Sequence, residues 1–114
     1  MPDIRISQAL RLWHQVHLDL VRDEEHDLSA RQTAILLTIY LELPPHTVRG
    51  LAEKLGVTKP VITRALDSMG KDGLVTRKRD DFDKRNVIIQ RTVKGALAVE
   101  KLGETIIRET RALV

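Results

Sequence analysis

The chain has 114 residues, a net charge of +3 and no cysteine. This length suffices for one domain with a single core, and the lack of cysteine excludes a disulfide scaffold, a thiol redox sensor and thiolate zinc. We expect a cytoplasmic protein without membrane contact. The N-terminus lacks the pattern of a signal peptide, and no segment has the ~18 consecutive apolar residues of a membrane helix.

The first half of the chain predicts two helices. The apolar positions of residues 4–25 recur at helical steps and share one face with a histidine: Ile6, Leu10, Trp13, His17 and Leu20. A capping box from Ser29 to Gln32 opens the second helix, residues 29–43, and Pro44 ends it. The apolar residues expected along this second helix are Ile35, Leu36, Ile39, Tyr40 and Leu43.

Two shorter helices, residues 47–55 and 59–71, are joined by Gly56-Val57-Thr58. We expect Gly56 to take positive φ and Thr58 to cap the second helix, which Gly73 closes. The second helix is expected to bury Val61, Ile62, Ala65, Leu66 and Met69. Residues 47–71 therefore predict a helix-turn-helix, although such spacing also occurs in ordinary helical cores.

A predicted wing, residues 74–92, follows the helix-turn-helix. The β-branched stretches 74–79 and 86–92 flank RKRDDFDKRN, residues 77–86, which holds five cations and three carboxylates. A last helix is expected over residues 93–113. The predicted fold is a single domain, residues 1–114, mainly α with a small β-hairpin: a winged helix-turn-helix of about five helices plus a wing.

Charge is distributed unevenly along the chain. Residues 1–46 carry a net charge of −3, residues 47–95 carry +6, and residues 96–114 are balanced. A basic surface over the helix-turn-helix and the wing is typical of a protein that binds a polyanion. Because the major groove of DNA admits one helix, the exposed N-terminal residues of helix 59–71 are expected to meet base edges, with Arg64 suited to guanine. The predicted DNA-binding residues are Thr47, Thr58, Lys59, Pro60, Thr63, Arg64, Arg77, Lys78, Arg79, Lys84 and Arg85.

Residues 47–95 resemble the DNA-binding core of the MarR (multiple antibiotic resistance repressor) family. Asp83-Lys84-Arg85 matches the family's Asp-x-Arg wing signature, Thr92-x-x-Gly95 follows it, and the two leading helices fit the family's order. The resemblance implies a sequence-specific regulator of transcription that binds double-stranded DNA as a homodimer, by default a repressor on a pseudo-palindromic operator. It also implies that helices 4–25 and 93–113 dimerise, and it leaves the identity of any small-molecule effector open.

The resemblance implies further that Arg85 enters the minor groove of DNA. Asp83 is expected to hold the Arg85 guanidinium and preset its direction. Asp80 and Asp81 are expected to cap the turn, and Phe82 to pack on the strands of the wing.

The sequence departs from the family pattern at a few positions. Val61 replaces a small polar residue, Gly70 is expected to loosen the last turn of its helix, and Arg91 replaces a buried leucine, so that the end of the second strand should be more exposed. The sequence stops at Val114, before the sixth helix of typical relatives, which leaves the dimer mode open.

Other site types receive less support. His14 and His17 share a helix face and could bind a metal, but the apolar neighbours of His17 favour packing, so no metal or cofactor is expected. The acidic stretch that includes Asp23, Glu24 and Glu25 is interpreted as a solvated face. No nucleophile elbow or phosphate loop is present, and an enzyme is not expected. Two alternatives stay open: a winged helix that binds an acidic protein partner, and a non-specific architectural DNA binder.

Overall fold

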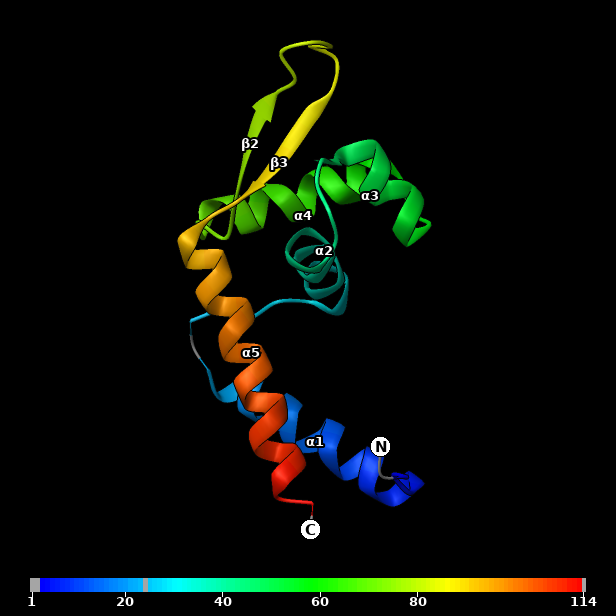
Figure 1. Cartoon of the computed structure of the whole chain (residues 1–114), viewed down its shortest axis with the longest axis vertical. Helices are drawn as coiled ribbons and strands as arrows, with labels where there is room; N and C mark the ends of the chain where they lie inside the picture. Colours follow the sequence, from blue (N-terminus) through cyan, green and yellow to red (C-terminus); the bar gives the residue numbers. More distant parts are fainter. Residues whose placement is uncertain (1–2, 24, 114) are drawn as a thin grey trace. The chain divides into compact units, whose positions relative to one another are not determined.

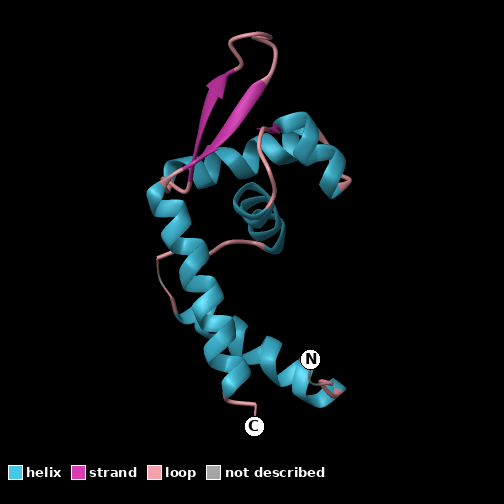
Figure 2. Ribbon diagram, in the orientation of Figure 1, coloured by secondary structure: helices cyan, strands magenta, loops and turns pink. Residues whose placement is uncertain are grey.

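The computed structural model describes residues 3–23 and 25–113; Glu24 of the acidic stretch lies outside them. This part of the chain forms five helices and three strands (Figures 1 and 2). They are α1 (Ile6–Arg22), α2 (Ala30–Leu41), β1 (His46–Thr47), α3 (Val48–Leu55), α4 (Lys59–Lys71), β2 (Val75–Arg79), β3 (Val87–Arg91) and α5 (Val93–Arg111). The predicted fold class, a mainly α winged helix-turn-helix, is confirmed, and among the described residues no helix is long and apolar enough to span a membrane.

The chain divides into two compact units, which are described separately. Residues 28–99 form the unit that contains the helix-turn-helix and the wing, and residues 1–27 with 100–114 form the other. Helix α5 contributes residues to both.

The core of the first unit lies among α2, α3, α4 and the base of the wing. Each helix buries its apolar stripe there, because the apolar residues recur at helical spacing. Leu43, expected on this stripe, is instead 91% exposed, since α2 ends at Leu41 and Leu43 lies in the connection to β1. The core residues are Ile35, Leu36, Ile39, Leu51, Ala52, Ile62, Ala65, Leu66, Met69, Leu74, Val75 and Ile89.

The predicted wing hairpin is the larger part of an antiparallel sheet with the order β1-β3-β2 in the described residues. Strands β2 and β3 pair from Val75 opposite Arg91 to Arg79 opposite Val87. The short strand β1, absent from the sequence prediction, pairs His46 with Ile89. Because β1 is two residues long, it has no alternation of apolar and polar residues that could reveal it.

The helix ends of the helix-turn-helix follow local chemistry with one exception. Thr47 precedes α3 and caps it, since its hydroxyl accepts a hydrogen bond from the Gly50 N–H at 3.0 Å. Thr58 holds the N-cap position of α4, but the predicted side-chain cap is wrong: its hydroxyl makes no capping bond with the described residues. Pro60, two residues further, has no N–H, so one of the two usual donors to such a cap is missing.

Two glycines take the positive φ that their turns require. Gly56, at the turn of the helix-turn-helix, has φ 68°, and Gly73, after α4, has φ 75°. Helix α4 continues through Gly70 to Lys71 before the Gly73 turn closes it.

In the second unit, α1 packs against the C-terminal part of α5 (Figure 1). Val16 is buried, and an ion pair joins the two helices, with Nη2 of Arg108 3.2 Å from Oδ2 of Asp19. The apolar face predicted for α1 stays largely exposed within this unit: Ile6 is 81% exposed and Trp13 62%.

His17 packs on Trp13 within α1. The two rings meet edge to face at 4.3 Å between centroids, and Nδ1 of His17 lies 2.9 Å from the carbonyl oxygen of Trp13. Within residues 3–23 and 25–113, no group of three or more histidine and acidic side chains is arranged to hold a metal ion.

Candidate nucleic-acid interface

Helix α4 has one buried face and one polar face. Ile62, Leu66 and Met69 have no measurable exposure, whereas Lys59, Pro60, Thr63 and Arg64 are exposed, as are Ser68 and Lys71. The residues predicted to reach base edges therefore lie together on the accessible side of the second helix of the motif. Arg64 lies along its helix, with Nε 3.5 Å from the carbonyl oxygen of Pro60.

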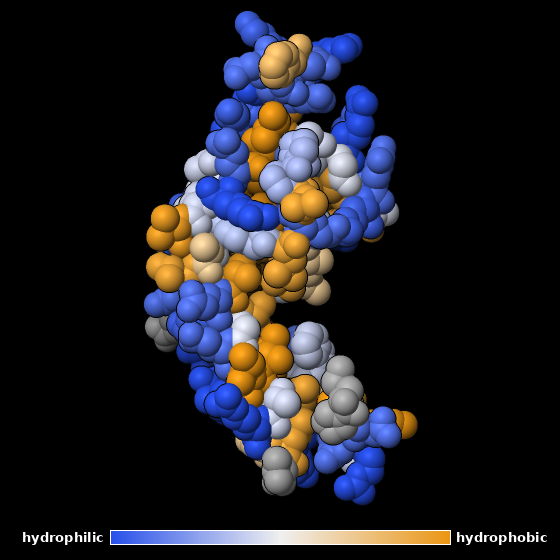
Figure 3. Space-filling model, viewed as in Figure 1, coloured by the Kyte–Doolittle hydropathy of each residue, from blue (hydrophilic) through white to orange (hydrophobic). Residues whose placement is uncertain are grey.

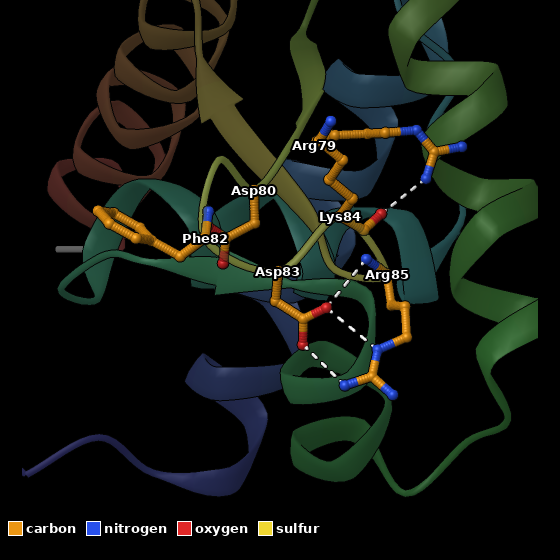
Figure 4. A network of polar contacts seen from close by, with 6 residues as sticks. All are labelled: Arg79, Asp80, Phe82, Asp83, Lys84 and Arg85. Carbon is orange, nitrogen blue, oxygen red and sulfur yellow. Dashed lines mark hydrogen bonds and ion pairs between the residues drawn. The ribbon is translucent and has the colours of Figure 1, made fainter.

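The Asp83–Arg85 contact predicted for the wing is present (Figure 4). Asp83 Oδ1 accepts hydrogen bonds from the backbone N–H of Arg85 and from its Nε, both at 3.1 Å, and Oδ2 lies 3.4 Å from Nη2. These bonds favour the carboxylate, so the side-chain bond from Arg85 is the main reason why the pKa of Asp83 is lowered. The guanidinium is therefore held while the Arg85 side chain stays 90% exposed.

The rest of the wing loop is held by its own polar groups. Asp80 accepts a hydrogen bond from the Phe82 N–H at 2.9 Å, the turn-capping role expected of it. Arg79 donates from Nη1 to the carbonyl oxygen of Lys84 at 2.7 Å, and the Asn86 N–H donates to the carbonyl oxygen of Asp83 at 2.9 Å. The loop is thus ordered from within.

Phe82 does not pack on the strands of the wing, and that prediction is wrong. Its side chain is 100% exposed and points away from the Asp83–Arg85 pair (Figure 4). The reason is geometric: the strands end at Arg79 and Val87, so Phe82, at the tip of the loop, has no strand surface beside it.

The remaining predicted wing cations differ in their surroundings. Arg77 forms an ion pair with Asp67 of α4, Nη1 to Oδ1 at 2.8 Å, and so links β2 to the second helix of the motif. Lys78 and Lys84 are exposed. Arg79 is exposed too, although its guanidinium bonds the loop backbone.

Sequence reasoning missed Arg49. This exposed cation lies in the first turn of α3 and contributes, after Arg85, to the lowered pKa of Asp83, which places its charge near the wing loop. With Lys59 it also lines a shallow hollow at the turn between α3 and α4. The available signal was its position two residues after the Thr47 cap, on the polar side of the helix.

A hydrogen-bonded cluster at the root of the wing explains the Thr92-x-x-Gly95 pattern. The hydroxyl of Tyr40 accepts from the Thr92 N–H at 2.9 Å and lies 2.8 Å from the carbonyl oxygen of Leu74. The Thr92 hydroxyl donates to the carbonyl oxygen of Gly73 at 2.7 Å and accepts from the Gly95 N–H at 2.9 Å. A Cβ on residue 95 would lie 1.9 Å from the Tyr40 hydroxyl, so only glycine fits there.

Arg91 is exposed, as expected of a departure from a buried leucine, but its guanidinium is engaged. Nε donates to the carbonyl oxygen of Ile39 at 2.8 Å, and Nη2 donates to that of Glu42 at 2.9 Å. A cation at these C-terminal carbonyls of α2 is favourable, because they have no partners within the helix. The end of β3 is therefore tied to α2.

Comparison with known proteins leads to the same family as the sequence motifs. The profile of the MarR family matches residues 28–87. The organic hydroperoxide resistance transcriptional regulator of Bacillus subtilis (strain 168) is 42% identical over 55 residues, 48% of this chain and 37% of that protein. The chain thus spans little more than a third of the length of that curated relative.

Solved structures share the fold. A mutant of S. aureus MepR has a TM-score of 0.77 at 21% identity, over 97% of this chain and 83% of that one. The structure of reduced AbfR bound to DNA has a TM-score of 0.70 at 26% identity, over 90% and 74% of the two chains. With the family profile covering more than half of the sequence, and with a fold of five helices and a wing in the described residues, the chain belongs to the MarR family.

Proposed function

We propose that this chain is a sequence-specific regulator of transcription that binds double-stranded DNA as a homodimer in the cytoplasm. One observation carries the proposal: the exposed polar face of α4 and a basic, internally ordered wing belong to the same compact unit. A helix that presents short polar and cationic side chains at its N-terminal end is the element that the major groove admits. The role requires no catalytic step, cofactor or metal.

The exposed residues divide by the part of DNA that each would meet. Lys59, Thr63 and Arg64 would contact bases and the adjoining backbone in the major groove. Arg85 would enter the minor groove, where a narrow A·T-rich segment attracts a guanidinium. Lys78, Lys84 and Arg49 would contact phosphates, which adds affinity without sequence preference.

Two of the predicted DNA-binding residues, Arg77 and Thr47, would support DNA binding without contacting DNA themselves. Arg77 is engaged by Asp67, and Thr47 caps α3. In this proposal they hold the wing and the first helix of the motif in position. Arg79, whose guanidinium bonds the Lys84 carbonyl, supports the loop and adds positive charge near the phosphates.

A dimer is supported by the apolar surface of the second unit. On α1, Ile6, Leu10 and Trp13 are 81%, 66% and 62% exposed, and on α5, Ile107 is 53% exposed. Contiguous apolar faces of this kind favour association. A two-fold dimer would present two α4 helices to successive major grooves, about 34 Å apart on a pseudo-palindrome. Light scattering at tens of micromolar should give twice the mass of the chain; a monomer there contradicts the dimer.

The names of the relatives favour repression over activation. One is a transcriptional regulator by its name and another is a repressor, the HTH-type transcriptional repressor YetL of Bacillus subtilis (strain 168), while reduced AbfR has been solved bound to DNA. Repression, by blocking access of polymerase to the operator, is the role we propose for this chain.

The deciding experiment is a selection of bound sequences from a random duplex pool, followed by titrations of a selected and a scrambled duplex at several salt concentrations. We expect an enriched two-fold-symmetric motif and an affinity that falls steeply with salt. Salt-dependent binding without enrichment would indicate an architectural DNA binder. No duplex binding at low salt would favour the protein-interaction alternative.

A further inference from the structure

Phe82 is an apolar side chain in a loop whose shape does not depend on it. Asp80 holds the Phe82 backbone, Asp83 holds Arg85, and Arg79 holds the carbonyl of Lys84, all by hydrogen bonds that leave the phenyl ring outside. The ring is 100% exposed. A loop whose backbone is held by hydrogen bonds therefore presents a phenyl ring to whatever the wing meets, so less backbone freedom is lost on binding.

Exposure alone would not be informative, since single exposed apolar residues are common on protein surfaces. The surroundings are informative. Residues 77–86 carry five cations and three carboxylates, a net charge of +2, and Figure 3 shows apolar atoms at the end of the wing surrounded by hydrophilic ones. Two of the carboxylates, Asp80 and Asp83, accept hydrogen bonds within the loop. A loop of net positive charge with an exposed ring favours a surface that is anionic overall and offers an apolar area the size of a ring.

Duplex DNA has this combination in its minor groove. The walls of the groove are deoxyribose faces, which are apolar, and phosphates border them. The loop that presents Phe82 is also the loop that presents Arg85, so both side chains would reach DNA at one place. In Figure 4 the two side chains leave the loop in different directions, so they would not occupy the same part of the groove.

We propose that Phe82 packs against the deoxyribose faces of the groove wall while Arg85 reads the groove itself. This inference rests on the proposed function and deepens it by adding an apolar contact to the wing. The contact adds affinity without reading bases and without releasing counterions. Phe82 thus differs from Arg64, which discriminates sequence, and from the lysines, which set the salt dependence.

The test uses the full chain and three variants. Phe82→Ala removes the ring, Phe82→Leu keeps an apolar side chain, and Arg85→Ala serves as the comparison at the same loop. Fluorescence anisotropy gives affinities for the selected and the scrambled duplex over a range of salt. Because Phe82 is fully exposed, the Ala variant is expected to melt at the wild-type temperature, which circular dichroism checks.

We expect Phe82→Ala to weaken both duplexes by about fivefold to tenfold per wing, the effect of losing a half-buried phenylalanine side chain. The slope of log affinity against log salt should not change, and Phe82→Leu should recover most of the loss. Arg85→Ala should instead reduce the slope and the preference for flanking A·T pairs.

Three results would overturn the inference. Wild-type affinity of Phe82→Ala would show that the ring does not touch DNA. Unstacking of a 2-aminopurine base on binding of the wild type but not of Phe82→Ala would mean that the ring is a wedge between bases. A lower mass of Phe82→Ala than of the wild type in light scattering would mean that the ring contacts a second copy of the chain. A wild type that binds no duplex removes the proposed function as well, whereas specific binding that is insensitive to Phe82→Ala removes only this inference.

Discussion

Gly95→Ala tests whether the wing root depends on the close approach of α5 to Tyr40. The added Cβ would lie 1.9 Å from the Tyr40 hydroxyl and 2.2 Å from the carbonyl oxygen of Leu74. Carbon and oxygen atoms that are not bonded need more than 3.0 Å, so the start of α5 has to move by about 1 Å. We expect overpacking to cost about 1–3 kcal/mol and the disturbed hydrogen bonds of Tyr40 a similar amount, less about 1 kcal/mol for the better helix propensity of alanine.

The net loss expected for Gly95→Ala is about 1–5 kcal/mol in the free energy of unfolding, with about 3 kcal/mol as the middle of the range. Urea denaturation followed by circular dichroism should show a lower midpoint at an unchanged slope, and the melting temperature should fall by about 10 °C. Gly103 is the matched control in the same helix, since a Cβ there meets no heavy atom of the described residues within 4 Å. Gly103→Ala should be neutral or stabilise by up to about 1 kcal/mol. A Gly95→Ala protein as stable as the wild type, or equal losses at both glycines, would refute the packing argument.

Three further predictions concern the wing, α4 and the second unit. Arg64→Ala should weaken a selected duplex by about 1–3 kcal/mol and spare a scrambled one in anisotropy titrations; equal losses would assign Arg64 to the backbone. Asp83→Ala should weaken binding although it removes a negative charge, and should have little further effect in an Arg85→Ala background, because no guanidinium is then left for Asp83 to orient. Tighter binding by Asp83→Ala would mean that this carboxylate only offsets charge. The hydrogen bond to Asp19 is the main cause of the raised pKa of Glu109, so this carboxyl keeps its proton to a higher pH in the folded chain than in the unfolded one. The same hydrogen bond is the main cause of the lowered pKa of Asp19. Above about pH 4.3, the part of the stability that comes from Glu109 should therefore fall as the pH rises. Thermal melts of Glu109→Gln, which cannot titrate, should lack that fall; the same pH dependence in the variant would assign it to another group.

The order of the helices and strands was predictable because the patterns that encode it are local. Apolar spacing located all five helices of the described chain, and the Ser29 capping box is present, with Ser29 Oγ accepting from the Gln32 N–H at 3.1 Å. The Asp83–Arg85 contact also joins residues two apart, within reach of a sequence signature.

What escaped prediction depends on residues distant in sequence or on the absence of a neighbour. Tyr40 meets Thr92 across 52 positions, and no spacing rule connects the two. The same separation joins Arg91 to Ile39, so its carbonyl partners could not be seen from the replaced leucine. Aromatic rings are usually covered, which favours packing for Phe82, but covering needs a surface, and the loop extends past both strands.

The wing hairpin is anchored to the rest of its unit at the base and extends freely toward its tip. Arg91 and Thr92 bind the base of the hairpin to α2 and to the turn after α4. Strand β1 pairs with β3 as far along the hairpin as Ile88. Between Arg79 and Val87, the hydrogen bonds and ion pairs of the described residues all lie within the hairpin. The hairpin should therefore move less at its base than at its tip, with amide exchange slower at the base than near the tip. Such a gradient would allow the tip to follow local variations in groove width while the base keeps its angle to α4.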